Sequence, residues 1–143
     1  MSNEDLKSRL LWYVDQLWNQ HNLAVIDEMI LPEFVDHSLP AGSPQGPEGA
    51  RQFAQVYLTA FPDTHLDFHE TVREGDTVVL RWTATGTHSG DLAGIPPTGK
   101  KMILPGLTLW RFQGGKFIES WNLFNQLTLL QQIGAFPAPA ANQ

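Results

Sequence analysis

The sequence predicts an α+β fold in which N-terminal helices cover one face of a curved, mostly antiparallel sheet. Apolar residues recur at steps of three and four as far as Phe61, and from Thr64 onward they alternate with polar residues. Helices followed by a run of long strands are typical of α+β domains. The chain has 143 residues, which fits one domain. We assign residues 1–136 to that domain and residues 137–143 to a flexible Pro/Ala tail.

Three helices are predicted in the N-terminal half of the chain and a fourth near its C-terminus. Residues 4–18 carry an amphipathic helix, and residues 23–30 a short second helix. Pro32 ends the second helix, because proline cannot continue the hydrogen-bond ladder. Pro47 suits the first position of a third helix, and residues 126–133 form a final short one. The buried face of the third helix is formed by Phe53, Val56, Tyr57 and Phe61.

Alternation of apolar and polar residues predicts the strands. They cover residues 34–37, 64–72, 77–87, 101–113 and 117–124. On the second of these strands we expect one face to carry Leu66, Phe68 and Val72. On the third, the inward face is expected to carry Val78, Leu80, Trp82 and Ala84. A long loop over residues 88–99, rich in glycine and proline, separates this strand from the next.

The strand over residues 101–113 is apolar on both faces. One face carries Met102, Leu104 and Trp110, and the other carries Ile103, Leu107 and Leu109. Because the helices cover only one face of the sheet, the second face needs a partner of its own. We expect a second copy of the chain there, giving a homodimer or higher homo-oligomer through the outer sheet face. The alternative is a strand wrapped on both faces within one monomer.

Composition excludes several classes of function. The chain has no cysteine, which removes disulfides, thiolate zinc sites and thiol nucleophiles. Its formal net charge is −6 and its basic residues do not cluster, so we expect no nucleic-acid partner. No stretch approaches the ~18 apolar residues of a membrane span, and the polar N-terminus has no signal-peptide core. We expect a cytoplasmic protein that does not bind membranes.

Several stretches of the chain are distinctive in combination. They are FPD at residues 61–63, GDTVVLRWTATGTH at 75–88, GIPPTGK at 94–100, ESWNLFN at 119–125 and LLQQIG at 129–134. Together with the early helices they resemble the SnoaL-like polyketide cyclase family over nearly the whole chain. The resemblance implies a cone-like α+β barrel, open at one end, which this family shares with nuclear transport factor 2, ketosteroid isomerases and scytalone dehydratases.

The resemblance also implies a chemistry. Characterised members of the family close a ring by an intramolecular aldol reaction on a polyketide ester, with no metal and no organic cofactor. Their acid/base group is an aspartate near the end of the last long strand. In this chain the matching run is Trp121-Asn122-Leu123-Phe124-Asn125, with an amide where a carboxylate is expected. An amide does not titrate near neutral pH, so Asn122 and Asn125 are candidates for orienting a substrate oxygen. If the inner face of the strand holds Trp121, Asn125 is the better candidate.

A replacement base is most naturally a histidine, because its ordinary pKa of ~6.5 supplies either protonation state. His88 ends a strand at the start of the long loop, and His37 follows a short apolar run. Each has the alternative of a structural hydrogen bond at the rim. Glu119 is the acidic alternative, either beside aromatic residues or simply in water. We expect the other histidines to lie on the surface and to bind no metal, namely His21, His65 and His69.

Aromatic residues are frequent in the strand half of the chain. We expect a pocket for a small hydrophobic molecule lined by Trp82, Trp110, Trp121 and Phe124, although each residue is equally compatible with ordinary core filling. The first functional hypothesis is a cofactor-independent cyclase or isomerase that moves a proton next to a carbonyl group. The second is a non-catalytic module that binds a small molecule or dimerises. Epoxide hydrolysis or dehydration is a third.

Overall fold

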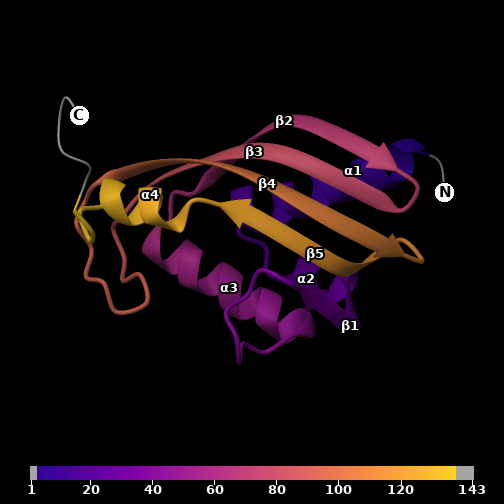
Figure 1. The fold of residues 1–143 in the computed structure, drawn as a ribbon, viewed down its shortest axis with the longest axis horizontal. Coiled ribbons are helices and arrows are strands. Elements are labelled where there is room, and N and C mark those ends of the chain that lie inside the picture. The colour runs from indigo at the N-terminus through magenta and orange to yellow at the C-terminus, as the bar shows by residue number, and fades with distance from the viewer. Residues whose placement is uncertain (1–2, 138–143) are drawn as a thin grey trace.

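The architecture is a curved five-stranded sheet with helices against one face (Figure 1). The computed structural model describes residues 3–137. The strand order is β1-β5-β4-β3-β2, with β1 parallel to β5 and all other neighbours antiparallel. The strands are β1 (Ile30–Asp36), β2 (His65–Glu74), β3 (Thr77–Thr87), β4 (Lys101–Gln113) and β5 (Lys116–Phe124). The predicted α+β class is therefore confirmed. The predicted tail lies, apart from Pro137, outside the described residues.

The helices follow the predicted segments with one correction. They are α1 (Asn3–Val14), the π-helical turn η1 (Asp15–Asn19), α2 (Ala24–Met29), α3 (Gly46–Ala60) and α4 (Gln126–Gln132). The prediction that Pro32 ends the second helix is wrong, because the chain is already extended at Ile30. Pro32 lies inside β1, an edge strand, where its missing N–H is tolerated. Within residues 3–137 no helix is long and apolar enough to cross a membrane.

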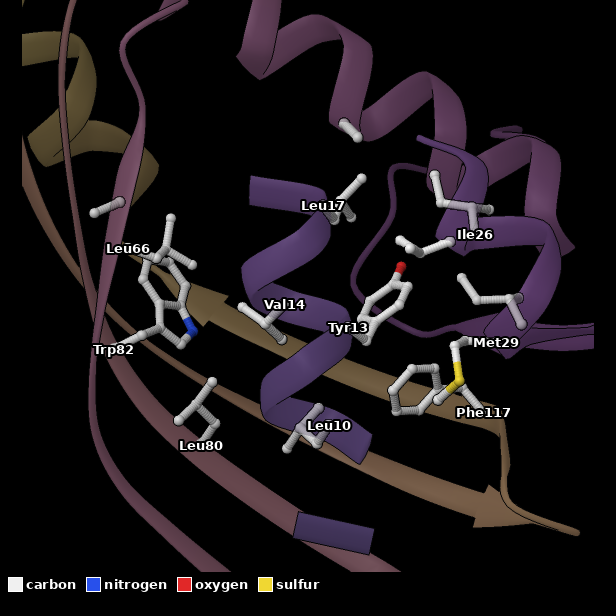
Figure 2. Packing of buried hydrophobic residues seen from close by; sticks show 14 of the residues in the cluster. Leu10, Tyr13, Val14, Leu17, Ile26, Met29, Leu66, Leu80, Trp82 and Phe117 are labelled. Atoms are coloured by element: carbon white, nitrogen blue, oxygen red, sulfur yellow. The ribbon is translucent and has the colours of Figure 1, made fainter. Parts of the chain in front are cut away.

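The hydrophobic core joins α1 and η1 to the sheet (Figure 2). Its helical side includes Leu10, Tyr13, Val14 and Leu17, and its sheet side includes Leu66, Leu80, Trp82 and Phe117. The predicted inward face of β3 is confirmed, since Val78, Leu80, Trp82 and Ala84 are all buried. On α3 the prediction is wrong at Val56, which is exposed, because Ala54 takes the position against the core. Fully burying a large core side chain such as Leu10 or Phe117 stabilises the folded state by about 1.5–3 kcal/mol.

Two β-bulges change which residues share a face. In β2 the register shifts between Phe68 and Glu70, so Val72 does not share the buried face of Leu66 and is 62% exposed. In the β4–β5 pair, Phe112 is opposite Phe117 but Arg111 is opposite Glu119, so Ile118 is one extra residue in β5. An extra residue reverses the alternation beyond it. The far half of β5 therefore places Ser120, Asn122 and Phe124 inward, and Glu119, Trp121 and Leu123 outward.

The outer sheet face is apolar and uncovered in the single chain. Ile103 is 61% and Leu123 66% exposed, and Leu107 of β4 lies directly opposite Leu123. The prediction that β4 is apolar on both faces is therefore confirmed, with Met102 and Leu104 on the buried side. Monomeric proteins rarely leave a continuous apolar patch of this kind open to water.

Candidate functional site

A small apolar cavity lies between the helices and the inward face of the sheet. Its volume is about 80 Å³, and its lining from the sheet includes Trp82, Leu104, Thr108, Trp110, Asn122 and Phe124. A larger outer cleft of about 630 Å³ lies between α3 and the loop that follows β1. Phe53, Tyr57, Asn122 and Phe124 line both spaces, so the inner cavity and the outer cleft meet at these side chains. Asn122 is thus the polar β5 residue at the passage between them.

A chain of hydrogen bonds orients the Asn122 side chain. The indole N–H of Trp82 donates to Thr108 Oγ1 at 3.0 Å, and Thr108 Oγ1 donates to Asn122 Oδ1 at 2.5 Å. Because an indole N–H can only donate, the Thr108 hydroxyl must accept it and turn its own hydrogen toward Asn122. The amide oxygen of Asn122 is therefore occupied. Its Nδ2 has no hydrogen-bond partner within residues 3–137 and remains available as a donor.

Gly106 makes room for Trp82, the first residue in this series of hydrogen bonds. It lies opposite Trp82 in the β3–β4 pair, and the indole lies directly over its backbone. A Cβ atom at this position would be 2.0 Å from the Trp82 ring, far inside van der Waals contact. The absence of a side chain at Gly106 thus lets the Trp82 indole lie flat against β4, where its N–H reaches Thr108.

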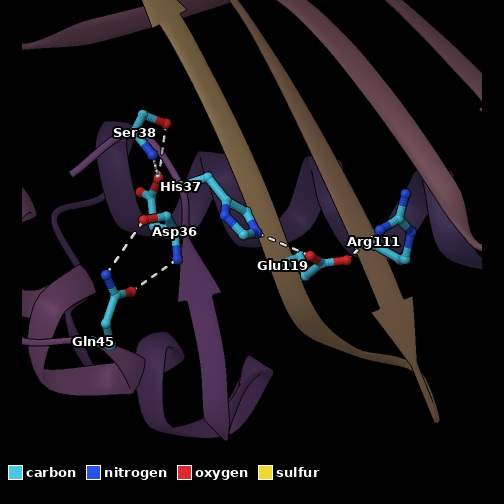
Figure 3. A network of polar contacts seen from close by, with 6 residues as sticks. All are labelled: Asp36, His37, Ser38, Gln45, Arg111 and Glu119. Atoms are coloured by element: carbon cyan, nitrogen blue, oxygen red, sulfur yellow. Dashed lines mark hydrogen bonds and ion pairs between the residues drawn. The ribbon is translucent and has the colours of Figure 1, made fainter.

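A second set of hydrogen bonds holds the rim of the outer cleft, and Figure 3 shows those among Asp36, Ser38 and Gln45. The backbone N–H of Asn122 donates to Ser38 Oγ at 2.6 Å, and Ser38 Oγ donates to Asp36 Oδ1 at 2.8 Å. The backbone N–H of Ser38 donates to the same carboxylate oxygen at 2.8 Å. Gln45 Oε1 accepts from the backbone N–H of Asp36 at 2.9 Å, which ties the start of the loop to its end. Asp36 and Ser38 both line the cleft.

Tyr57 supplies a hydroxyl where the two spaces meet. Its O–H donates to Gln126 Oε1 at 3.0 Å, and its ring contacts Phe53 and Phe124. Burial raises the pKa of the Tyr57 hydroxyl, which the hydrogen bond to Gln126 only partly offsets. Tyr57 is therefore a neutral phenol at physiological pH, suited to hydrogen bonding rather than to accepting a proton.

His37, Glu119 and Trp121 lie together on the outer face of the sheet. His37 Nε2 is 2.9 Å from Glu119 Oε2 (Figure 3). The His37 ring stacks on Trp121 with a centroid separation of 4.4 Å. Arg111 pairs with the other carboxylate oxygen of Glu119 and lies over the same indole. The hydrogen bond from His37, together with the charge and hydrogen bond of Arg111, lowers the pKa of Glu119. None of these side chains lines the inner cavity or the outer cleft.

His88 and Asn125 have structural partners. His88 is fully buried, with Nδ1 3.0 Å from Thr98 Oγ1 and its ring beside Phe61, and its Nε2 has no partner within the described residues. It lines neither the cavity nor the cleft. Asn125 caps α4 by accepting from the backbone N–H of Thr128 at 3.1 Å. The bulge at Ile118 is the reason that Asn122, and not Asn125, faces inward.

Sequence reasoning thus placed part of the site. Trp82, Trp110, Phe124 and Asn122 come together at the cavity, whereas Trp121 and Glu119 do not. His21, His65 and His69 are exposed, as predicted. Sequence reasoning missed Asp36, Ser38, Tyr57 and Thr108. The alternation of β4 is a signal for Thr108, since it shares the parity of Met102 and Leu104. Within residues 3–137 no group of three or more acidic or histidine side chains is placed to hold a metal ion.

The fold and the cavity define a class of protein, the NTF2-like α+β cone with an apolar interior. An NTF2-like protein of unknown function from Burkholderia pseudomallei has the same fold. It is 16% identical, with a TM-score of 0.73 over 93% of this chain and 98% of its own.

Sequence comparison then identifies the family. The model of the SnoaL-like polyketide cyclase family matches residues 8–133, and the chain belongs to this family, as its residues predicted. AclR from Streptomyces galilaeus, a candidate hydroxylase, is 29% identical with a TM-score of 0.83, covering 98% of this chain and 87% of its own. A candidate SnoaL-like polyketide cyclase from Jannaschia sp. CCS1 is 28% identical with a TM-score of 0.83, covering 96% and 98%. No curated protein matches the chain.

We predict that Thr108→Val lowers the free energy of unfolding by about 1–3 kcal/mol, because it leaves the Trp82 N–H and Asn122 Oδ1 without their shared partner. Urea unfolding followed by tryptophan fluorescence measures this change. Thr85→Val is the matched control, since Thr85 lies on the outer face of β3 and should change stability by no more than about 0.5 kcal/mol. Equal effects of the two substitutions would contradict the hydrogen-bond chain.

We predict that Glu119→Gln lowers the Tm at pH 7 and that the difference disappears in acid. A carboxylate whose pKa is lowered in the folded state stabilises the protein above its unfolded pKa, ordinarily ~4.3, and loses this effect as the pH falls through the folded value. Thermal unfolding between pH 7 and pH 2 measures it, with Glu33→Gln, exposed on β1, as the control. A difference that persists unchanged at the lowest pH is the contrary result.

Proposed function

We propose that this protein binds a small hydrophobic carbonyl compound and catalyses a cofactor-independent proton transfer next to the carbonyl group, as a cyclase or an isomerase does. One observation carries the proposal: the available Nδ2 donor of Asn122 lies at the passage between an apolar cavity and an open cleft. Small-molecule sites combine a mainly apolar lining with a few directed polar groups. Membership of the SnoaL-like polyketide cyclase family supports the same ligand class.

The two volumes indicate how a ligand would be arranged. Ligand pockets usually measure roughly 300–1,000 Å³. The inner cavity, at about 80 Å³, is too small for a whole substrate, whereas the outer cleft of about 630 Å³ is within that range. A ligand would therefore place one apolar end in the inner cavity between Trp82 and Trp110. Its remaining length would lie in the cleft between α3 and the loop after β1.

The carbonyl oxygen of such a ligand would accept a hydrogen bond from Asn122 Nδ2. Removing a proton from the adjacent carbon moves negative charge onto this oxygen, and a fixed N–H donor stabilises the enolate more than the neutral carbonyl. Thr108, itself held by Trp82, donates a hydrogen bond to the amide oxygen of Asn122. The amide is therefore fixed in direction and does not need to reorient during the reaction. This fixed geometry is what electrostatic catalysis requires.

A non-catalytic binding protein is the second candidate. The observation in its favour is that the inner cavity is lined by no aspartate, glutamate or histidine among the described residues. Such a protein would bind the same carbonyl ligand without exchanging its α-hydrogens. The rate of hydrogen–deuterium exchange at the α-carbon, measured by NMR with and without protein, separates the two candidates.

We predict that Asn122→Leu weakens the binding of ethyl benzoylacetate, an aromatic β-keto ester, by up to about tenfold, because one hydrogen bond contributes roughly 0.5–1.5 kcal/mol. Quenching of tryptophan fluorescence measures the affinity, and binding of n-butylbenzene, which has no carbonyl group, should not fall. Asn125→Ser is the control, since serine also caps a helix. Loss of affinity in Asn125→Ser but not in Asn122→Leu is the result that rejects this site.

We further propose that the outer sheet face is covered by a second copy of the chain. The proposal is supported by the exposure of Ile103, Leu107 and Leu123 on adjacent strands. A two-fold related copy would present the same apolar surface and bury both.

Leu123→Glu is predicted to convert the proposed homodimer into a monomer, because it places a charge on this apolar face. Sedimentation velocity measures the change in mass. Glu33→Gln, an exposed substitution on the edge strand β1 that introduces no new charge, should leave the mass of the dimer unaltered. A wild-type chain that sediments as a monomer at micromolar concentration rules the interface out.

A further inference from the structure

We propose that Asp36 is the general base of the site, an inference that rests on the proton-transfer function proposed above. It goes beyond that function because it assigns the acid/base role to β1, at the edge of the sheet, rather than to the last strand. Three features carry it: the face that Asp36 occupies, its hydrogen bonds, and its relation to Asn122.

The register of β1 turns the Asp36 side chain toward the concave side. Asp36 is paired with Ser120, and Val35 with Glu119, in the parallel β1–β5 ladder. Residues paired in this way point to the same side of a sheet. Ser120 is buried inward and Glu119 faces outward, so Asp36 is on the inward side, and Val35 is correspondingly exposed. Among the residues described, Asp36 is the one carboxylate that lines either the inner cavity or the outer cleft.

The hydrogen bonds of Asp36 leave one carboxylate oxygen available. Both the N–H and the hydroxyl of Ser38 donate to Oδ1, and no group in residues 3–137 donates to Oδ2. The two bonds to Oδ1 fix the plane of the carboxylate. A general base needs such a fixed direction together with an unoccupied lone pair that faces the substrate.

A single hydroxyl group joins the Asp36 carboxylate to the backbone of Asn122. Ser38 Oγ lies 2.8 Å from Asp36 Oδ1 and 2.6 Å from the backbone nitrogen of Asn122. One bridging oxygen therefore sets the separation between the Asp36 carboxylate and the Asn122 backbone, and both residues line the cleft. A ligand whose carbonyl oxygen accepts from Asn122 Nδ2 would have its α-carbon in the cleft that Asp36 also lines.

The step is a balanced proton transfer. The α C–H bond breaks and its proton binds to Asp36 Oδ2. The electron pair of that bond forms the carbon–carbon double bond of the enolate, and the carbonyl π pair moves onto the oxygen held by Asn122. Return of the proton to another carbon gives an isomer. Attack of the enolate carbon on an internal aldehyde or ketone closes a ring, and the resulting alkoxide takes the proton from Asp36. Either course regenerates the carboxylate.

Other titratable groups near Asp36 do not take its place. On α1, Tyr13 has its pKa raised by burial and, to a smaller degree, by the negative charge of Asp36, so its hydroxyl keeps its proton. His37 and Glu119 are bonded to each other on the opposite face of the sheet. From the loop before α3, the groups that hydrogen-bond to Asp36 are the amide of Gln45 and the hydroxyl of Ser38, and neither of them titrates.

The test compares Asp36→Asn with wild type and with Glu33→Gln, an exposed carboxylate on the same strand. Ethyl benzoylacetate is the probe, and both its affinity and the protein-dependent rate of α-deuterium exchange are measured. We expect Asp36→Asn to bind within about twofold of wild type and to lose at least about 100-fold in exchange rate, the usual contribution of a general base. Glu33→Gln should match wild type in both. Exchange by Asp36→Asn within about threefold of wild type overturns the assignment.

A second variant guards against a local change in the loop. Asp36→Ala removes the carboxylate entirely, and added sodium formate should restore part of the exchange rate by occupying the vacated position. Sodium chloride at the same concentration should not. Absence of rescue in a variant that still binds the ester counts against Asp36. Failure of the wild-type protein to bind the ester is a different result, because it rejects the proposed function itself and the assignment of Asp36 with it.

Discussion

One extra residue in β5 decides which side chains can reach the interior. Ile118 has no partner of its own in the β4–β5 ladder, so every residue after it changes face. Without this bulge Trp121 would point into the cavity and Asn122 into the outer sheet face. With it, the amide enters the cavity, and the charged pair of Glu119 and Arg111 stays on the other side. The composition of the site and of the outer surface thus depends on the same single insertion.

The polar groups of the cavity are few because each has a cost. An unpaired polar group buried in an apolar space costs about 1–3 kcal/mol. Trp82, Thr108 and Asn122 avoid this cost by bonding in series, and the series ends at Asn122, which lies at the passage between the cavity and the cleft. In the proposed function, a ligand oxygen would complete the series. The arrangement stabilises the fold and aims a donor with the same bonds.

Much of the fold follows from alternation in the sequence. The bounds of β3 and β4 and the inward face of β3 are predictable, because these strands are long, regular and half covered. The faces of Val72 and Asn122 are not, because a bulge leaves no local mark in the pattern of apolar residues. The early start of β1 was also missed, since Pro32 is typical of a helix end and is compatible with a strand only at a sheet edge.

The position of β1 beside β5 explains why a carboxylate can be absent from the last strand without leaving the cleft uncharged. The two strands are parallel neighbours, so their carboxyl ends reach the same rim. A carboxylate at position 122 would put a second negative charge in the cleft that Asp36 lines, and the two charges would repel each other. An amide at Asn122 removes this repulsion and adds an N–H donor. In the proposed mechanism, β1 would carry the negative charge and β5 would carry the group that stabilises negative charge on the ligand.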